Sequence, residues 1–249
     1  MEENKGNKFD NSVCLKLLTT ITIKNCVYID LENPSLPRIV ELNKNSPSIV
    51  YLCKKDKRLA KVIQLVGDIS YAIHENQYEF LIHEIIEQML SKKAGNKIFS
   101  RLADLCGGMV SAEAVNNLSD DEIKNVGTSS TKVSYIRSVT EAVLLGQINF
   151  DDLEKLSDID VFNTLTSIKG IGRWTANMYL IFVLDRQDIL PTNDSAFQQA
   201  FQWRYKLGRS ENTIRKKCGK WRPYSSIASR YLYRALDSGL TKSEFYLYK

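Results

Sequence analysis

The amino-acid sequence predicts a mostly α-helical protein with a small N-terminal segment that can form β structure. From Lys57 onward, apolar residues recur almost throughout at the spacing of helices that have one buried face. No repeat, low-complexity tract or long linker divides residues 57–249. Residues 18–31 instead alternate with β-branched side chains, which is typical of a short strand pair, until Pro34 breaks the pattern. We therefore expect an N-terminal segment at 1–56 and a helical body at 57–249.

The helical body divides into short helices whose ends carry recognisable signals. Gly67, Gly107 and Gly146 each follow an apolar stripe, and glycine commonly ends a helix because it adopts positive φ without strain. Ser111 and Ser119 precede two other stripes and are expected to cap them. The predicted helices are 59–66, 78–90, 98–106, 112–118, 120–126, 135–145, 151–156, 157–165, 174–184, 196–205 and 224–236.

Composition narrows the class of protein. The chain is 43% hydrophobic and 25% charged, which is ordinary for a globular protein. The longest apolar run, 178–184, is too short to span a bilayer, and the polar N-terminus lacks the shape of a secretory signal. We expect a monomeric, cytoplasmic protein that does not bind membranes. Its five scattered cysteines are expected to be free thiols, and with two histidines they provide no side-chain metal site.

Positive charge is concentrated in one segment. Residues 201–235 contain ten basic side chains and a single acidic one, although the net charge of the whole chain is only +5. Such a segment favours contact with phosphates along an extended face, with a solvated helix face as the alternative.

The most informative stretch is a predicted helical hairpin at 165–184. Gly170 and Gly172 flank an isoleucine, and two glycines suit a tight turn between helices because each can adopt positive φ. The second helix would then start near Arg173, with its free N–H groups and positive dipole end pointing outward. An anion such as a DNA phosphate would bind at this helix start.

Four blocks of residues follow one another along 56–236. They are Phe80-Leu81-x-x-Glu84-Ile85-Ile86-x-Gln88-x-Leu90-Ser91, Gly127-x-Ser129-x-x-Lys132-x-x-Tyr135-Ile136, Leu165-x-x-Ile168-x-Gly170-Ile171-Gly172-x-x-Thr175-Ala176 with Pro191 and Asp194, and Trp221-x-Pro223-Tyr224-x-Ser226-x-Ala228. In this order they resemble the helix-hairpin-helix DNA glycosylase superfamily, and residues 173–176 are similar to its DNA-3-methyladenine glycosylase II branch. The resemblance implies a two-lobed helical fold that binds damaged double-stranded DNA, with a catalytic aspartate loop at 188–195.

Asp194 is the predicted catalytic residue. Breaking an N-glycosidic bond builds positive charge on the deoxyribose, and a fixed carboxylate near the anomeric carbon stabilises that charge and can orient water. An isolated aspartate before a helix is more often a helix cap, but its position in the whole motif favours catalysis. The two roles are compatible.

The resemblance also bears on the type of reaction and on cofactors. Superfamily members that also cut the strand carry a nucleophilic lysine two residues after the last hairpin glycine. That position is Trp174 here, and Lys169 precedes the glycines, so we expect base removal without a lyase step. Some relatives hold an iron–sulfur cluster on four C-terminal cysteines, whereas only Cys218 lies in that region here, so no cluster is expected.

A pocket for a flipped base follows from the same resemblance. Trp174, Met178 and Tyr224 are its expected walls, because cationic alkylated bases bind electron-rich aromatic rings. Met178 stands where relatives often carry an aromatic residue, and core packing is an equal alternative.

DNA contacts are expected on two segments. Met89 is expected to fill the gap left by the flipped nucleotide, with core packing on the 78–90 stripe as the alternative. Gln88 and Ser91 are expected to hydrogen-bond near the lesion. Phosphates are expected to contact the hairpin at Lys169, Gly170, Gly172, Arg173 and Thr175. The resemblance is also compatible with a cation bound by the backbone carbonyls of the hairpin.

The leading functional prediction is a monofunctional DNA glycosylase that releases alkylated purines of the 3-methyladenine type in base excision repair. Two alternatives remain on sequence alone. One keeps the fold but acts on uracil, hypoxanthine or a mismatched base, and the other is a non-catalytic module that binds damaged DNA.

Overall fold

The computed structural model describes residues 27–28 and 38–247 of the 249-residue chain. The described part is mostly helical, as predicted. Its elements in chain order are β1 (Val27–Tyr28), β2 (Ile39–Leu42), α1 (Pro47–Lys55), α2 (Lys57–Val66), β3 (Ile69–Ala72), α3 (Gln77–Glu87), α4 (Lys92–Leu105), α5 (Ala112–Asn116), α6 (Asp120–Asn125), α7 (Ser130–Leu144), α8 (Phe150–Leu153), α9 (Asp158–Thr166), α10 (Arg173–Phe182), α11 (Ser195–Tyr205), α12 (Glu211–Cys218), the 3-10 turn η1 (Gly219–Trp221), α13 (Ser225–Asp237) and the 3-10 turn η2 (Leu240–Lys242).

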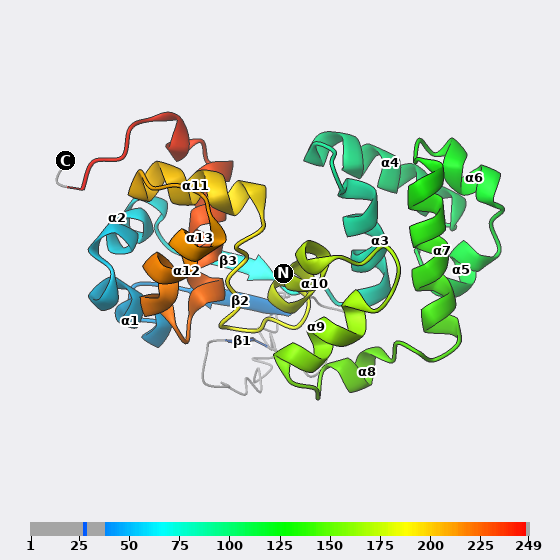
Figure 1. Cartoon of the computed structure of the whole chain (residues 1–249), viewed down its shortest axis with the longest axis horizontal. Helices are drawn as coiled ribbons and strands as arrows, with labels where there is room; N and C mark the ends of the chain where they lie inside the picture. Colours follow the sequence, from blue (N-terminus) through cyan, green and yellow to red (C-terminus); the bar gives the residue numbers. More distant parts are fainter. Residues whose placement is uncertain (1–26, 29–37, 248–249) are drawn as a thin grey trace, which may run out of the picture.

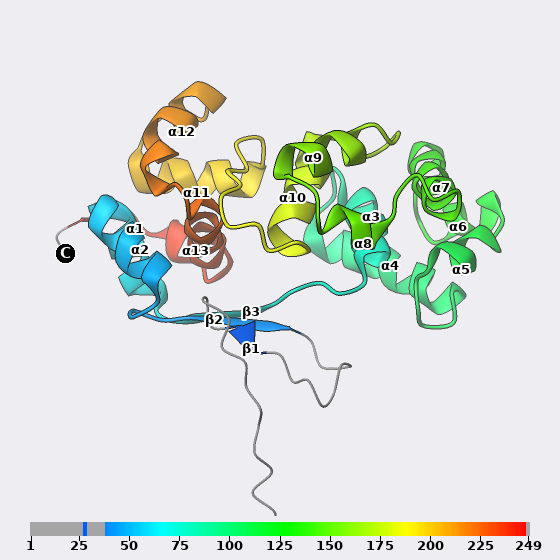
Figure 2. The same ribbon diagram turned by 90° about the horizontal axis from the view of Figure 1, so that it is seen from below.

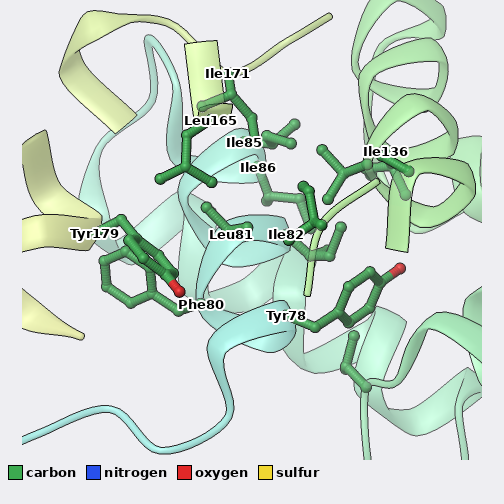
Figure 3. Close-up of a cluster of buried hydrophobic side chains, with 14 of the residues drawn as sticks. Tyr78, Phe80, Leu81, Ile82, Ile85, Ile86, Ile136, Leu165, Ile171 and Tyr179 are labelled. Carbon is green, nitrogen blue, oxygen red and sulfur yellow. The ribbon is translucent and has the colours of Figure 1, made fainter. Parts of the chain in front are cut away.

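The elements form two lobes, each with its own core (Figure 1). The helical lobe consists of α3–α10, and the mixed lobe consists of the sheet, α1, α2 and α11–α13. In the helical lobe, α3 supplies most of the central apolar side chains, and α7, α9 and α10 pack around them (Figure 3). No helix in the described ranges is long and apolar enough to cross a membrane.

A three-stranded antiparallel sheet in the order β1-β2-β3 belongs to the mixed lobe. It lies below α2 and α13 in Figure 2, and Val40 and Ile69 from its strands join the core with those helices. Most of the predicted strand pair at 18–31 lies outside the described residues, and β1 is the part that can be seen. The four-residue strand β3 is an exception to the helical pattern expected almost throughout after Lys57.

The mixed lobe also contains residues from both sides of the expected boundary between 56 and 57. The helices α1 and α2 flank that point, and both contribute side chains to one core with α11 and α13. Asp56 lies between them, almost fully buried, where its side chain caps α2 and its Oδ1 lies 2.6 Å from Arg204 Nη2. This ion pair joins the N-terminal segment to α11. The chain leaves the mixed lobe after β3, forms the helical lobe, and returns to the mixed lobe at α11.

The cysteines that the structure describes, Cys53, Cys106 and Cys218, are free thiols as expected. Cys14 and Cys26 lie outside the described residues.

Candidate active site

The helical hairpin forms as predicted, between α9 and α10. Gly170 has φ +98°, and a Cβ atom at this position would lie 2.4 Å from the Cβ of Tyr135, so any larger residue would clash. Gly172 differs from the prediction, because its φ is −94° and nothing lies near its missing side chain. It is the N-cap of α10, and glycine has no side chain to cap the helix. The first N–H groups of α10 therefore remain available to an anion.

Asp194 lies at the start of α11, and its two carboxylate oxygens have different partners. Oδ1 accepts the backbone N–H of Phe197 at 2.6 Å, so the predicted helix cap is present. Oδ2 accepts the indole N–H of Trp174 at 2.8 Å. The side chain is 6% exposed. Because Trp174 lies in the first turn of α10, this bond joins the hairpin of the helical lobe to a carboxylate of the mixed lobe.

The loop before Asp194 is fastened to the start of α13. Asp188 accepts a hydrogen bond from Ser225 Oγ at 2.6 Å and pairs with Arg222 Nε at 2.7 Å. The backbone N–H of Ile189 donates to Ser226 Oγ at 2.9 Å. These contacts explain why the Trp221–Ala228 block accompanies the aspartate loop in the sequence.

Of the three predicted pocket residues, the structure brings only Trp174 to Asp194. Met178 is buried in the core of the helical lobe, which supports the packing alternative. Tyr224 packs edge-on against Tyr51, with ring centroids 5.4 Å apart, in the mixed lobe. Within the described ranges it has no hydrogen bond or ring contact with Trp174 or Asp194.

Another aromatic side chain, Tyr233, lies near Asp194, and sequence reasoning missed it. Tyr233 on α13 contacts Phe182 on α10, with ring centroids 6.0 Å apart. Burial raises the pKa of Tyr233 well above its usual value, and the charge of Asp194 is the next cause. Its buried hydroxyl has no hydrogen-bond partner of ordinary geometry among the described residues, but its interaction with the Asp194 carboxylate also raises its pKa. On sequence alone Tyr233 is one of two tyrosines in α13, so only the fold singles it out.

Met89 lies in the turn between α3 and α4, and its side chain is fully exposed. Its φ of +59° is uncommon for a residue other than glycine, and it ends α3 earlier than the predicted 78–90 helix. The core-packing alternative for Met89 is therefore wrong. Ser91, two residues further on, caps α4 by accepting the N–H of Ala94 at 3.3 Å.

Two side chains hold the Met89 turn against its neighbours. Gln88 Nε2 donates to the carbonyl of Gly170 at 3.0 Å, which joins the turn to the hairpin. Lys132 Nζ donates to the carbonyls of Ile86 and Gln88 at 2.8 and 2.7 Å. Lys132 thus binds the last carbonyls of α3, where a cation is favourable, and burial lowers its pKa. Its place in the second sequence block was the only signal of this role.

The hairpin residues predicted to contact phosphate fall into two groups. Lys169 and Arg173 are exposed, with Lys169 Nζ 2.9 Å from Ser134 Oγ and Arg173 Nη2 3.2 Å from Glu211 Oε1. Thr175 is only 1% exposed, so the expectation that its hydroxyl meets a phosphate is wrong. It faces the core because α10 is buried along the side that packs on α3.

The basic segment 201–235 is not one phosphate-contacting face. Arg204 and Arg230 are buried, and they pair with Asp56 and Asp185 at 2.6 and 3.2 Å. Several others are also paired or hydrogen-bonded within the protein: Lys206, Arg209, Arg215, Lys220, Arg222 and Arg234. Asp56 and Asp185 therefore neutralise two of these charges inside the mixed lobe, and most of the others are paired or hydrogen-bonded at its surface.

Three potential metal ligands meet on α3: His83, Glu84 and Glu87, whose ligand atoms all lie within 4.8 Å of one another. His83 Nε2 is 2.8 Å from Asn96 Oδ1, which orients the ring. Sequence spacing did not single this group out, because carboxylates are common on helix surfaces.

The match to a known family covers more than half of the chain. A model of the family described as HhH-GPD superfamily base excision DNA repair protein matches residues 82–223. The chain belongs to this family. The matched region begins within α3, includes the hairpin and the Asp194 loop, and ends just before α13.

Two solved structures are similar in fold to this HhH-GPD protein, and a curated relative is similar in sequence. The crystal structure of a DNA-3-methyladenine glycosidase from Bacillus halodurans has a TM-score of 0.73 and 32% identity, covering 83% of this chain and 96% of that one. The 3-methyladenine DNA glycosylase Mag1 of Schizosaccharomyces pombe, solved in complex with abasic DNA, has a TM-score of 0.71 and 28% identity, covering 77% and 97%. The alkylbase DNA glycosidase-like protein mag2 of the same yeast is 29% identical, over 74% of this chain and 90% of its own. The resemblance of the four sequence blocks and the two-lobed, mostly α fold are thereby confirmed.

Proposed function

We propose that this HhH-GPD protein is a DNA glycosylase that hydrolyses the N-glycosidic bond of alkylated purines of the 3-methyladenine type in base excision repair. The observation that carries the proposal is the hydrogen bond between Trp174 and Asp194. It places a carboxylate of limited exposure beside the start of α10, where free N–H groups suit a DNA phosphate. The relatives named above for 3-methyladenine or alkylbase glycosylases support this choice of lesion.

Asp194 would act on the sugar of a nucleotide that has been flipped out of the duplex. As the bond between C1′ and the purine nitrogen breaks, its electron pair leaves with the base and positive charge builds on the deoxyribose. The carboxylate stabilises that charge and accepts the proton of the water that adds to C1′. Its two N–H donors, from Phe197 and Trp174, hold the oxygens in place for this step.

Base removal without strand cleavage is part of the proposal. A lyase step needs an amine that attacks C1′, and the residue bonded to Asp194 is an indole. Lys169 precedes the hairpin turn, and its Nζ is directed to Ser134 on α7. The product would be an abasic site.

The DNA-binding part of the proposal uses segments that the structure holds together. Met89 would fill the space of the flipped nucleotide, with Gln88 and Lys132 fixing its turn. Lys169, Arg173 and the N-terminus of α10 would bind the strand. We further propose that the protein acts as a monomer near the nucleoid, without a cofactor, and that a cation on the hairpin carbonyls would be structural.

The test is to follow the bases released from duplex DNA that has been methylated or deaminated. We expect release of 3-methyladenine by the wild-type protein and little release of hypoxanthine or uracil. Asp194→Asn keeps an oxygen that can accept the Phe197 N–H, so we expect it to bind DNA normally and to lose roughly 100-fold or more in rate. Preferred release of a deaminated base would reassign the lesion, and an unchanged rate in the variant would remove Asp194 from the reaction.

A further inference from the structure

Glu84 is a carboxylate in the interior of the structure that the proposed reaction does not use. It lies on α3 and is 9% exposed. Among the described residues, its carboxylate pairs with His83, whose Nδ1 lies 3.9 Å from Glu84 Oε1, beyond hydrogen-bond distance. Within the described ranges its carboxylate accepts no hydrogen bond. Burial removes part of the water around this carboxylate, and no described group replaces that water with a hydrogen bond of ordinary length.

The surroundings of Glu84 are mostly negative. Glu87 lies one turn further along α3, and its Oε1 is buried without a hydrogen-bond partner among the described residues. Burial raises the pKa of Glu84, the contact with His83 opposes that rise, and the charges of Glu87 and Asp194 add to it. Three carboxylates therefore share this region with one imidazole. A positive ligand would relieve their repulsion.

Glu84 lies on the face of the helical lobe that meets the Asp194 loop of the mixed lobe. Phe80, one turn before it on α3, packs edge-on against Tyr179 of α10, with ring centroids 6.4 Å apart. Gln88, one turn after it, bonds to the hairpin. This helix face therefore points toward α10 and the Asp194 loop. The charge of Glu84, from across the junction, acts on Tyr233 together with the charge of Asp194.

We propose that Glu84 is a specificity-determining residue that selects purines carrying a positive charge. The inference rests on the proposed function and names the property of the lesion that the site recognises. A purine methylated at N3 or N7 is cationic while it is attached to deoxyribose, whereas hypoxanthine and uracil are neutral. Glu84 would attract the cationic ring and leave neutral bases without a compensating partner for the carboxylate.

Glu84 and Asp194 would have different roles, because the positive charge moves from the base to the sugar as the bond breaks. Before the bond breaks, the positive charge is on the base, where Glu84 would stabilise it. As the bonding electrons move to the base, the charge passes to the sugar, which Asp194 would stabilise. Glu84 therefore strengthens binding of the lesion and Asp194 accelerates bond breaking. Affinity for an uncleaved lesion is the measurement that isolates Glu84.

The experiment compares two duplexes that differ by one methyl group and one charge. Each contains a 2′-fluoro nucleotide, either 7-methylguanine or guanine, because the fluorine disfavours positive charge at C1′ and keeps the bond intact. We expect the wild-type protein to prefer the methylated duplex, and Glu84→Gln to reduce that preference about tenfold. Affinity for the unmethylated duplex should not change. Glu79→Gln is the matched control on α3, since glutamine can still accept the bond that Asn76 donates at 3.2 Å.

Several results would overturn the inference. One is a Glu84→Gln protein that keeps the full preference for the methylated duplex. Another is a Glu84→Gln protein whose affinity falls equally for both duplexes. The third is a wild-type protein that binds the two duplexes equally well. Loss of the preference on adding a chelator would show that His83, Glu84 and Glu87 hold a metal instead. If the wild-type protein releases methylated bases while any of these results holds, the proposed function stands and only the role of Glu84 falls. If it releases none, the proposed function fails and the inference fails with it.

Discussion

The indole of Trp174 holds the proposed catalytic carboxylate in position, because its N–H donates a hydrogen bond to Asp194 Oδ2 at 2.8 Å. A tryptophan beside a base pocket is usually assigned to stacking. Here the ring also holds one oxygen of the proposed catalytic carboxylate, while the backbone of Phe197 holds the other. Stacking and positioning can be separated by substitution, because phenylalanine keeps an aromatic face and lacks the N–H.

We predict that Trp174→Phe slows base release by roughly 10- to 100-fold, since a hydrogen bond to a charged group contributes about 1.5–3 kcal/mol. Duplex binding should change little, because the hairpin contacts remain. Trp174→Ala, which also removes the ring, should be slower still on cationic bases. Single-turnover base release and duplex affinity, measured on the same variants, check both statements. A Trp174→Phe protein with wild-type rates would show that the indole N–H does not position Asp194.

For single residues, the sequence predicted a role correctly where the contacts of the residue are close to it in the chain. The cap made by Asp194 could be predicted because the residue precedes a helix. The positive φ of Gly170 could be predicted because the residue lies in a tight turn. The phosphate contact expected of Thr175 was wrong, and Met178 packs in the core, because the buried side of α10 is set by α3, about 90 residues away in the chain. Tyr233 reaches the site only through packing of the two lobes.

At the level of elements, most helices appear where periodicity placed them. The exceptions have physical reasons. The helix α12 was not predicted because its charged sequence contains few apolar residues, although Ile214 and Cys218 are buried. The strand β3 contains one buried residue in four, so its alternation was too weak to detect. The end of α3 was placed too late because Met89 and Leu90 continue the apolar stripe beyond the turn that ends it.

The hairpin turn offers a prediction about stability. Gly170→Ala would place a side chain at φ +98° and 2.4 Å from Tyr135, so we expect a loss of roughly 2–4 kcal/mol in the free energy of unfolding. Gly172→Ala is the matched control. Its φ of −94° suits any residue and its surroundings are open, so the expected loss is about 1 kcal/mol or less. Urea unfolding of the two variants measures the difference, and equal losses would contradict it.

In the molecule as a whole, Asp56 joins distant parts of the mixed lobe. Besides Arg204, its carboxylate accepts the indole N–H of Trp221 at 3.0 Å and the hydroxyl of Tyr205. Burial alone would raise the pKa of Asp56, but Arg204 and these hydrogen bonds hold it well below its usual value. A carboxyl group with a lowered pKa stabilises the fold above its unfolded pKa, and this contribution is lost as the pH falls toward the folded value.

We predict that Asp56→Asn lowers the free energy of unfolding by roughly 3–5 kcal/mol at pH 7, because it leaves the buried Arg204 without its counter-charge. The difference from wild type should shrink as the pH falls below about 4, where the wild-type protein begins to lose the same contribution. Urea unfolding from pH 7 to pH 3 measures it. Asp104→Asn, an exposed residue on α4, should cost about 0.5 kcal/mol or less. A gap that stays constant with pH would contradict the assignment.

The bond between Trp174 and Asp194 crosses from one half of the molecule to the other. A small rotation of the halves about the connections after β3 and α10 would separate the indole from the carboxylate while leaving both cores intact. Catalytic competence would therefore depend on closure, and activity could disappear on heating before any loss of helix is detected. The hydrogen bond between Trp174 and Asp194 would then form only when the two lobes have closed, as they would around the DNA.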